Sequence, residues 1–265
     1  MKMVSAAKLR RATDAIMSQR PYANEIATLM NALSDEGYSD SDNVNRKPVS
    51  LLVAFSSDRG LCGANNSNVI RATANLIQEK KSSGKEVKCV FVGKKVQEMI
   101  KSRFKIEPIH YEEFGQKITF RRATELAKII GPLFDRGEVD EVIFVYNEFI
   151  NAIAQDTISE KVLPIGAEAT EGTAKKSRDL SIFVPSKKAI YDALASKYFT
   201  IQIFKAFLEA QASEHGARMS AMDNATRNAG DMIRKLTLQY NKQRQAAITK
   251  ELLEIIAGSE SQKTA

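Results

Sequence analysis

The fold is decided near the end of the chain by residues 186–257, SKKAIYDALASKYFTIQIFKAFLEAQASEHGARMSAMDNATRNAGDMIRKLTLQYNKQRQAAITKELLEIIA. This stretch contains no proline, and only Gly216 and Gly230 interrupt a composition that favours helix. Ser186 suits the start of a helix and Gly258 suits its end. About 70 residues at 1.5 Å each would extend roughly 105 Å, which is far more than a compact domain needs.

The first 36 residues predict a second helix that could pair with the long one. Apolar, small and uncharged side chains recur there at alternating spacings of three and four, the pattern of a coiled coil. These positions are Leu9, Ala12, Ile16, Gln19, Ala23, Ile26, Met30 and Leu33. A similar alternation begins at Met219 and continues to Ala247. We therefore expect the terminal helices to form an antiparallel coiled coil, with Gly216 and Gly230 permitting close approach by the first helix.

Between the helices, residues 48–186 alternate strand and helix patterns. The predicted strands cover 49–55, 87–92 and 141–146, with shorter candidates at 106–111, 161–165 and 180–184. The predicted helices cover 65–82, 94–103 and 116–135. Continuous apolar strands that alternate with helices are typical of a sheet covered on both faces. The expected fold class is thus α/β: a central Rossmann-like domain, together with the antiparallel coiled coil of the N- and C-terminal helices.

The expected organisation has four parts. They are an N-terminal coiled-coil helix (1–36), the α/β domain (48–186), a C-terminal coiled-coil helix (187–257) and a tail (258–265). No run of the sequence approaches the 18 apolar residues that a membrane-spanning helix needs. The start of the chain also lacks the apolar core of a secretory signal, so we expect a reducing compartment.

Charge and composition narrow the function classes. The net charge is +7, from 39 basic and 32 acidic residues, which favours acidic partners, nucleic acid or a membrane surface. Two cysteines and two histidines exclude a disulfide scaffold, a four-cysteine zinc site and histidine-rich metal chemistry. The apolar end of the long helix, at Leu252, Leu253, Ile255 and Ile256, predicts a partner socket, because such a surface would otherwise be exposed.

An enzymatic function finds little support. The segment SSDRGLCGA at 56–64 lies between a predicted strand and helix, where a phosphate loop would lie, but it matches neither of the glycine-rich phosphate-binding motifs. Cys62 has no identified histidine partner. We expect no catalytic residue, no cofactor and no metal. The two alternatives are a coiled-coil adaptor that binds acidic partners or nucleic acid, and a degenerate nucleotide-binding enzyme.

Four segments carry a resemblance that covers nearly the whole chain. They are MKMVSAAKLRRA at 1–12, SSDRGLCGANN at 56–66, ARMSAMDNATRNAGDMI at 217–233 and LTLQYNKQRQAAITKELLEIIAG at 236–258. In this order they closely resemble the γ-subunit family of F-type ATP synthases. In that family the terminal helices form a rotating shaft inside a ring of α and β subunits. The α/β domain rests on the membrane ring of c subunits, beside the ε-type subunit (δ in mitochondria).

The resemblance implies a non-catalytic role. Such a subunit couples proton-driven rotation of the c ring to ATP synthesis or hydrolysis in the β subunits. It implies a peripheral membrane protein, on the cytoplasmic face in bacteria or the matrix face in mitochondria. Members of the family usually carry further residues before the MKMV segment, so Met1 is expected inside the first helix.

The resemblance also implies partner-contact residues. Arg244, Gln245, Thr249 and Glu251 match positions that contact β near its catch loop. Three further residues match the region that faces the acidic lever of β: Arg59, Met1 and Lys2. The apolar end of the helix matches the part held in the bearing of the ring: Leu252, Leu253, Ile255 and Ile256.

Overall fold

The computed structural model describes residues 1–34, 48–115, 117–165 and 187–263, in two compact units that divide between Ser220 and Ala221. Its elements are α1 (Lys2–Ser34), β1 (Val49–Phe55), α2 (Asn65–Ser82), β2 (Glu86–Val92), α3 (Lys94–Phe104), β3 (His110–Glu112), α4 (Phe120–Asp135), β4 (Glu141–Phe149), β5 (Gln155–Leu163) and α5 (Lys187–Lys263). Among the described helices, none combines the length and apolar character that crossing a bilayer requires.

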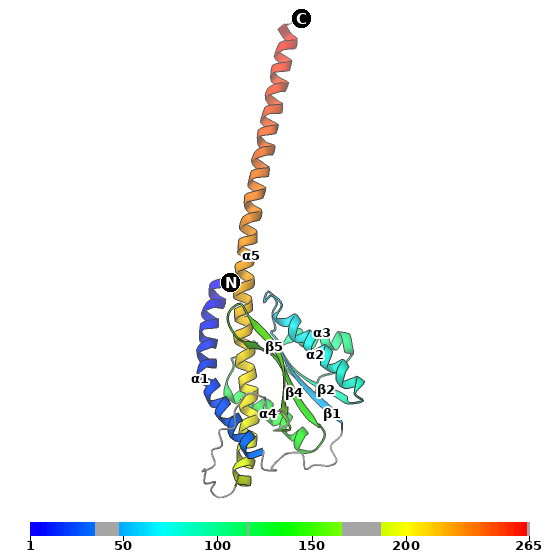
Figure 1. Cartoon of the computed structure of the whole chain (residues 1–265). Coiled ribbons are helices and arrows are strands. Elements are labelled where there is room, and N and C mark those ends of the chain that lie inside the picture. The colour runs from blue at the N-terminus through cyan, green and yellow to red at the C-terminus, as the bar shows by residue number, and fades with distance from the viewer. Residues whose placement is uncertain (35–47, 116, 166–186, 264–265) are drawn as a thin grey trace. The chain divides into compact units, whose positions relative to one another are not determined.

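The strands of the first unit form one sheet in the order β3-β2-β1-β4-β5 (Figure 1). The first four are parallel and β5 is antiparallel to β4. Every residue of β1 is buried, as expected for a central strand. At the two edges the predictions were partly wrong. The candidate at 106–111 is reduced to β3, and the candidate at 161–165 is only the end of β5, whose start is polar and half-buried. The candidate at 180–184 lies outside the described residues.

Helices cover both faces of the sheet. Alternate side chains of β1 point to opposite faces: Leu52 and Ala54 pack with α2 and α3, whereas Val53 and Phe55 pack with α1, α4 and α5. The Phe55 and Phe207 rings meet edge to face at 5.3 Å between centroids, so the first part of α5 belongs to the core. The prediction of a sheet covered on both faces is confirmed.

The spacing pattern in α1 correctly marks its buried side. Seven of the eight positions are buried, and Gln19 is half-buried. Leu9 and Ala12 share a cluster with Leu208 and Ala212, whereas Met30 lies in the cluster that holds the earlier part of α5. The two helices therefore pack antiparallel within the first unit, and Figure 1 shows them side by side.

The expected role of Gly216 in admitting α1 is wrong. A β-carbon on Gly216 would lie 3.4 Å from the Phe149 ring and 3.5 Å from Ala152, so this glycine admits the end of β4 and the turn after it. A β-carbon on Gly230 would meet nothing within 4 Å. Gly230 lies in the second unit, so its expected role in helix pairing stays a prediction. The glycine pattern indicated close approach but not which element approaches.

The second unit contains the rest of α5. From Asn224 to Ser259 its side chains are exposed, except that Gly230 and Asn241 are half-buried. Gly258 does not end the helix, which continues to Lys263. Glycine lowers helix stability by about 1 kcal/mol relative to alanine but does not forbid a helix, so the predicted end at Gly258 was wrong.

Candidate functional site

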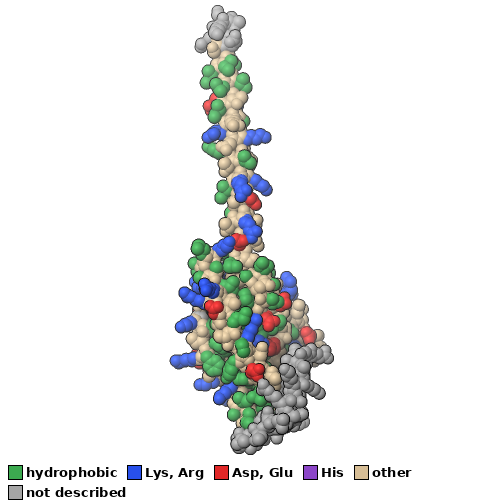
Figure 2. Space-filling view, turned by 60° about the vertical axis from the view of Figure 1, so that its left-hand side comes forward, with side chains coloured by type: hydrophobic (Ala, Val, Ile, Leu, Met, Phe, Trp, Pro, Cys, Tyr) green, Lys and Arg blue, Asp and Glu red, His purple; other side chains and the backbone are tan. Residues whose placement is uncertain are grey.

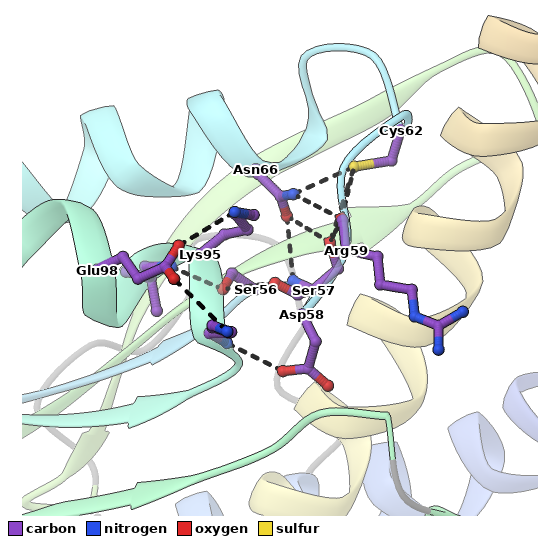
Figure 3. A network of polar contacts seen from close by, with 10 residues as sticks. Ser56, Ser57, Asp58, Arg59, Cys62, Asn66, Lys95 and Glu98 are labelled. Carbon is purple, nitrogen blue, oxygen red and sulfur yellow. Dashed lines mark hydrogen bonds and ion pairs between the residues drawn. The ribbon is translucent and has the colours of Figure 1, made fainter.

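The loop between β1 and α2 is fixed by one side chain from the first turn of α2 (Figure 3). The Oδ1 atom of Asn66 accepts hydrogen bonds from the Ser57 backbone N–H at 3.0 Å and from the Ser57 hydroxyl at 2.9 Å. Its Nδ2 atom donates to the Arg59 carbonyl and to the Cys62 sulfur, each at 3.2 Å. This amide closes the loop onto itself, while the Arg59 side chain extends away from the network and is exposed.

The start of α3 is capped by the same loop. The Asp58 carboxylate accepts hydrogen bonds from the backbone N–H groups of Lys94 at 2.9 Å and of Phe114 at 3.1 Å, and it also accepts from Gly115. The Ser56 hydroxyl accepts from the Val96 N–H at 3.0 Å. Free N–H groups at a helix start are what a phosphate would use. Here the chain supplies its own acceptors, which favours a structural role for this loop over nucleotide binding.

Cys62 is buried within that loop. Its sulfur contacts the Asn66 amide, the Ser57 hydroxyl at 3.8 Å and the Arg59 carbonyl at 3.8 Å. None of these groups is a base that could take the thiol proton, so the contacts favour packing over nucleophilic chemistry. Cys89 lies in the core, and burial raises the pKa of its thiol to about 12.

A cavity of about 460 Å³ brings two of the predicted contact residues together. Met1 and Arg59 both line it; Lys2 is exposed on α1 and does not. On α5, Arg218 pairs with Glu214 at 2.6 Å and donates to the Gly60 carbonyl at 3.3 Å. The remaining lining comes from α1, α5, the β1–α2 loop and the segment after β3. This wall combines charged, polar and apolar groups, which suits a protein surface better than a small apolar ligand.

Two buried groups in that wall have shifted pKa values. Burial, together with the Arg218 and Lys8 charges, lowers the pKa of His215 to about 4. Burial raises the pKa of Glu214 although Arg218 opposes the shift. His215 Nδ1 has no hydrogen-bond partner among the described residues. At neutral pH this wall therefore holds a neutral imidazole beside the Glu214–Arg218 pair.

The other predicted contact residues lie on the second unit. Arg244, Gln245, Thr249 and Glu251 are all exposed on α5. The apolar residues beyond them are exposed by half or more: Leu252 54%, Leu253 61%, Ile255 69% and Ile256 58%. Figure 2 shows hydrophobic and basic side chains along this part of α5. A water-exposed helix of this composition suits a partner that covers it.

The buried charged residues that were not predicted from the sequence include Glu209 and Arg122. Arg20 of α1 bonds Glu209 of α5, whose side chain is 1% exposed. Arg122 of α4 lies over the Phe207 ring at 4.8 Å and pairs with Glu112 at 3.3 Å. A signal for Glu209 was present in FKAFLEAQA, where one acid interrupts an apolar run of α5. Burying such a charge is costly unless it is paired, so its position could have indicated a basic partner.

Comparison with known proteins agrees with this architecture. The family model described as ATP synthase matches residues 1–261. The chain is 43% identical to the ATP synthase gamma chain of Geobacter metallireducens, over 99% of this chain and 92% of that protein. It is 42% identical to the gamma chain of Fuscovulum blasticum, over 98% and 92% of the two chains.

Solved structures share the fold at lower identity. A central-stalk chain of the Tetrahymena thermophila mitochondrial ATP synthase matches with a TM-score of 0.63 and 22% identity, covering 85% of this chain and 97% of that one. A chain from the Euglena gracilis enzyme matches with a TM-score of 0.61 and 18% identity, covering 97% and 95%. The sequence matches, which span almost the whole chain, establish that it belongs to the ATP synthase gamma-chain family.

Proposed function

We propose that this chain is the rotary central-stalk subunit of an F-type ATP synthase. It is non-catalytic: it couples proton-driven rotation of a c ring to ATP synthesis or hydrolysis in β subunits. Its partners are a ring of α and β subunits, an ε-type subunit and the c ring. One observation carries the proposal. A helix anchored in an α/β core continues through more than thirty-five residues, Asn224–Ser259 and beyond, whose side chains are almost all exposed.

The mechanism requires unequal contacts between this chain and the three-fold ring. A shaft can shift the nucleotide affinity of a β subunit only by binding one β conformation better than another. The exposed part of α5 carries basic, apolar and polar side chains, including Arg234, Leu236 and Gln239. In the proposed mechanism these side chains contact each β subunit differently as the shaft turns, and each angular position favours a different β conformation.

Specific residues are proposed for these contacts. Arg244 and Gln245, with Thr249 and Glu251, bind β near its catch loop. Arg244 suits this role because a guanidinium can donate two parallel hydrogen bonds to a carboxylate. Arg59, Met1 and Lys2 face the acidic lever of β, and the apolar residues Leu252, Leu253, Ile255 and Ile256 turn in the bearing. The exposure of these side chains supports the assignments.

The remaining parts follow from the same role. Residues 48–186 form the base that receives torque, and residues 1–36 and 187–257 form the shaft. The chain is held at the membrane through the complex, on the face where ATP is made: the cytoplasmic face in bacteria or the matrix face in mitochondria. The net charge of +7 supports partners with acidic surfaces.

The test is reconstitution of the full chain with its α and β subunits. The complex is fixed to a surface, a bead is attached to the α/β domain, and ATP hydrolysis and bead rotation are recorded together. Unidirectional rotation that stops without ATP is the expected result. Hydrolysis without rotation would contradict the shaft role. Failure to assemble, combined with salt-sensitive DNA binding by the chain, would favour the adaptor alternative.

A further inference from the structure

Three elements meet at Arg20, Glu209 and the backbone of Phe149. Arg20 of α1 donates to Glu209 of α5 from Nε to Oε1 at 2.8 Å and from Nη2 to Oε2 at 3.0 Å. The same Nη2 donates to the Phe149 carbonyl at the end of β4, at 2.8 Å. The Phe149 N–H donates back to Glu209 Oε2 at 2.9 Å. Each element is bonded to the other two, so the contacts form a closed triangle.

The triangle holds the Glu209 carboxylate in the protein interior, where an unpaired charge is unfavourable. The Glu209 side chain is 1% exposed and that of Arg20 is 34% exposed. The hydrogen bond to Glu209 raises the pKa of Arg20, against the opposing effect of burial. Replacing a buried ion pair by apolar side chains is often neutral or stabilising, so stability alone is a weak reason for this pair. What it provides beyond apolar packing is direction, because hydrogen bonds lose strength steeply with angle.

The neighbouring helix contacts lack that direction. Around the triangle, α1 and α5 meet through Leu9, Ala12, Leu208 and Ala212. Such contacts are non-directional, so they define the angle between the two helices less sharply than hydrogen bonds do. The bonds of the triangle resist sliding or rolling of one helix on the other, since either movement would break a bidentate pair.

One turn further along α5, a second set of bonds continues from the triangle into the sheet. The Ser213 hydroxyl donates to the Asn147 carbonyl of β4 at 2.9 Å. The Asn147 amide donates to Asn65 Oδ1, at the start of α2, at 2.7 Å. The Thr157 hydroxyl of β5 donates to Asn147 Oδ1 at 2.6 Å. Directional bonds thus run from α1 through α5 and β4 to α2 on the other face of the sheet.

We propose that the Arg20–Glu209–Phe149 triangle is a torque-bearing joint that locks α1 and α5 to the α/β domain. This rests on the proposed rotary function. Arg20 and Glu209 are positioning residues: they contact no nucleotide and act by fixing the angle between the base and both terminal helices. Without the joint the rotor still turns, but it twists further under the same load.

The test measures rotor stiffness in the assembled complex. Glu209→Gln keeps the shape but removes the charge and places an amide N–H₂ against donors. Arg20→Met removes the donors, and Arg20→Lys keeps the charge but not the bidentate geometry. The readout is the angular spread of a bead on the α/β domain during the pause between steps. The matched control is Glu160→Gln, because Glu160 links Lys205 of α5 to Tyr146 of β4 without reaching α1.

The joint predicts a wider angular spread for all three variants than for wild type and for Glu160→Gln, with rotation retained. It also predicts that Arg20→Lys fails to restore stiffness. An unchanged spread in Glu209→Gln and Arg20→Lys, or an equal increase in Glu160→Gln, would overturn the proposal. If the wild-type complex does not rotate, the proposed rotary function is wrong, whether or not the joint exists. Hydrogen exchange of the Phe149 amide in the full chain then still tests the joint: roughly tenfold faster exchange in Glu209→Gln supports it, and unchanged exchange overturns it.

Discussion

Gly93 and Ser56 pass so close that a β-carbon on Gly93 would lie 2.1 Å from the Ser56 carbonyl oxygen. Gly93 also has a φ of 103°, a conformation that residues with a β-carbon rarely adopt. Gly93 is the N-cap residue of α3 and lies next to the loop that carries Arg59. The close approach joins the ends of β1 and β2 at the edge where the candidate site lies.

Gly93→Ala is therefore expected to lower the free energy of unfolding by about 3 kcal/mol or more, through the clash and the backbone strain together. Urea unfolding of the full chain would measure the change. Gly84→Ala is the matched control, because Gly84 also has a positive φ of 77° but open space around it. It should cost about 1 kcal/mol. Equal losses in the two variants would mean that the contact with Ser56 is unimportant.

Glu141 predicts an acid-dependent loss of stability. Burial by itself disfavours the charge, but hydrogen bonds from Lys80, Ser50 and Lys85 outweigh it and lower the pKa of Glu141 to about 2. Since the ordinary value is 4.5, the stabilisation is complete above about pH 4.5 and is lost as the pH falls toward 2. Glu141→Gln should lose about 3 kcal/mol at neutral pH. Urea unfolding measured from neutral pH down toward pH 2 should show the difference in unfolding free energy between Glu141→Gln and wild type shrinking as the pH falls. A difference that stays constant would contradict the ion-pair explanation.

His215 predicts a second pH effect in a different window. Its folded pKa of about 4 lies below the ordinary 6.5, so the unfolded chain binds the proton more readily. The stabilisation that comes from the neutral His215 side chain is fully present above pH 6.5. It decreases as the pH falls from 6.5 to 4, by up to about 3 kcal/mol. His215→Gln should flatten the dependence between pH 6.5 and 4 in the same unfolding series. The Glu214 contribution cancels to first order, because both proteins contain it.

Arg244 and Arg227 provide a matched pair on the exposed part of α5. Arg227 forms an ion pair with Asp223 on its own helix, whereas Arg244 has no ion-pair partner in the described part of the chain. Loss of a partner-bound Arg244 should weaken the contact by about 1–3 kcal/mol. An exposed pair is worth at most about 1 kcal/mol. ATP made per proton in reconstituted vesicles should therefore fall further in Arg244→Ala than in Arg227→Ala, and similar losses would argue against a special catch contact.

Periodic patterns predicted the parts of the fold that local physics determines. The alternating spacing in α1 marks its buried side because helix geometry fixes which residues share a face. The apolar runs at β1 and β4 could be predicted because central strands are buried on both faces. The start of β5 could not, since an edge strand with polar residues on it resembles a loop. The helix end at Gly258 failed because a glycine cap needs a following turn that the sequence does not enforce.

Little of the candidate site could be predicted from the residues alone. The composition of α5 indicated its apolar end, whereas Arg59 and Arg244 came only from the family resemblance, and their partner contacts stay a prediction. Asp58 could not be predicted, because its hydrogen bonds from Lys94 and Phe114 join segments distant in sequence. Arg20 and Glu209 are separated by 189 positions, so only the acid in an apolar run hinted at their pairing.

The exposed apolar side chains at the end of α5 also affect how the subunit must be made. Before assembly, the side chains of Leu252, Leu253, Ile255 and Ile256 are exposed to water. Unassembled copies would therefore expose apolar segments through which they could aggregate or be cleaved by proteases. A cell gains from producing this subunit in step with the ring that covers it, since any surplus would aggregate or be degraded rather than wait as a reserve.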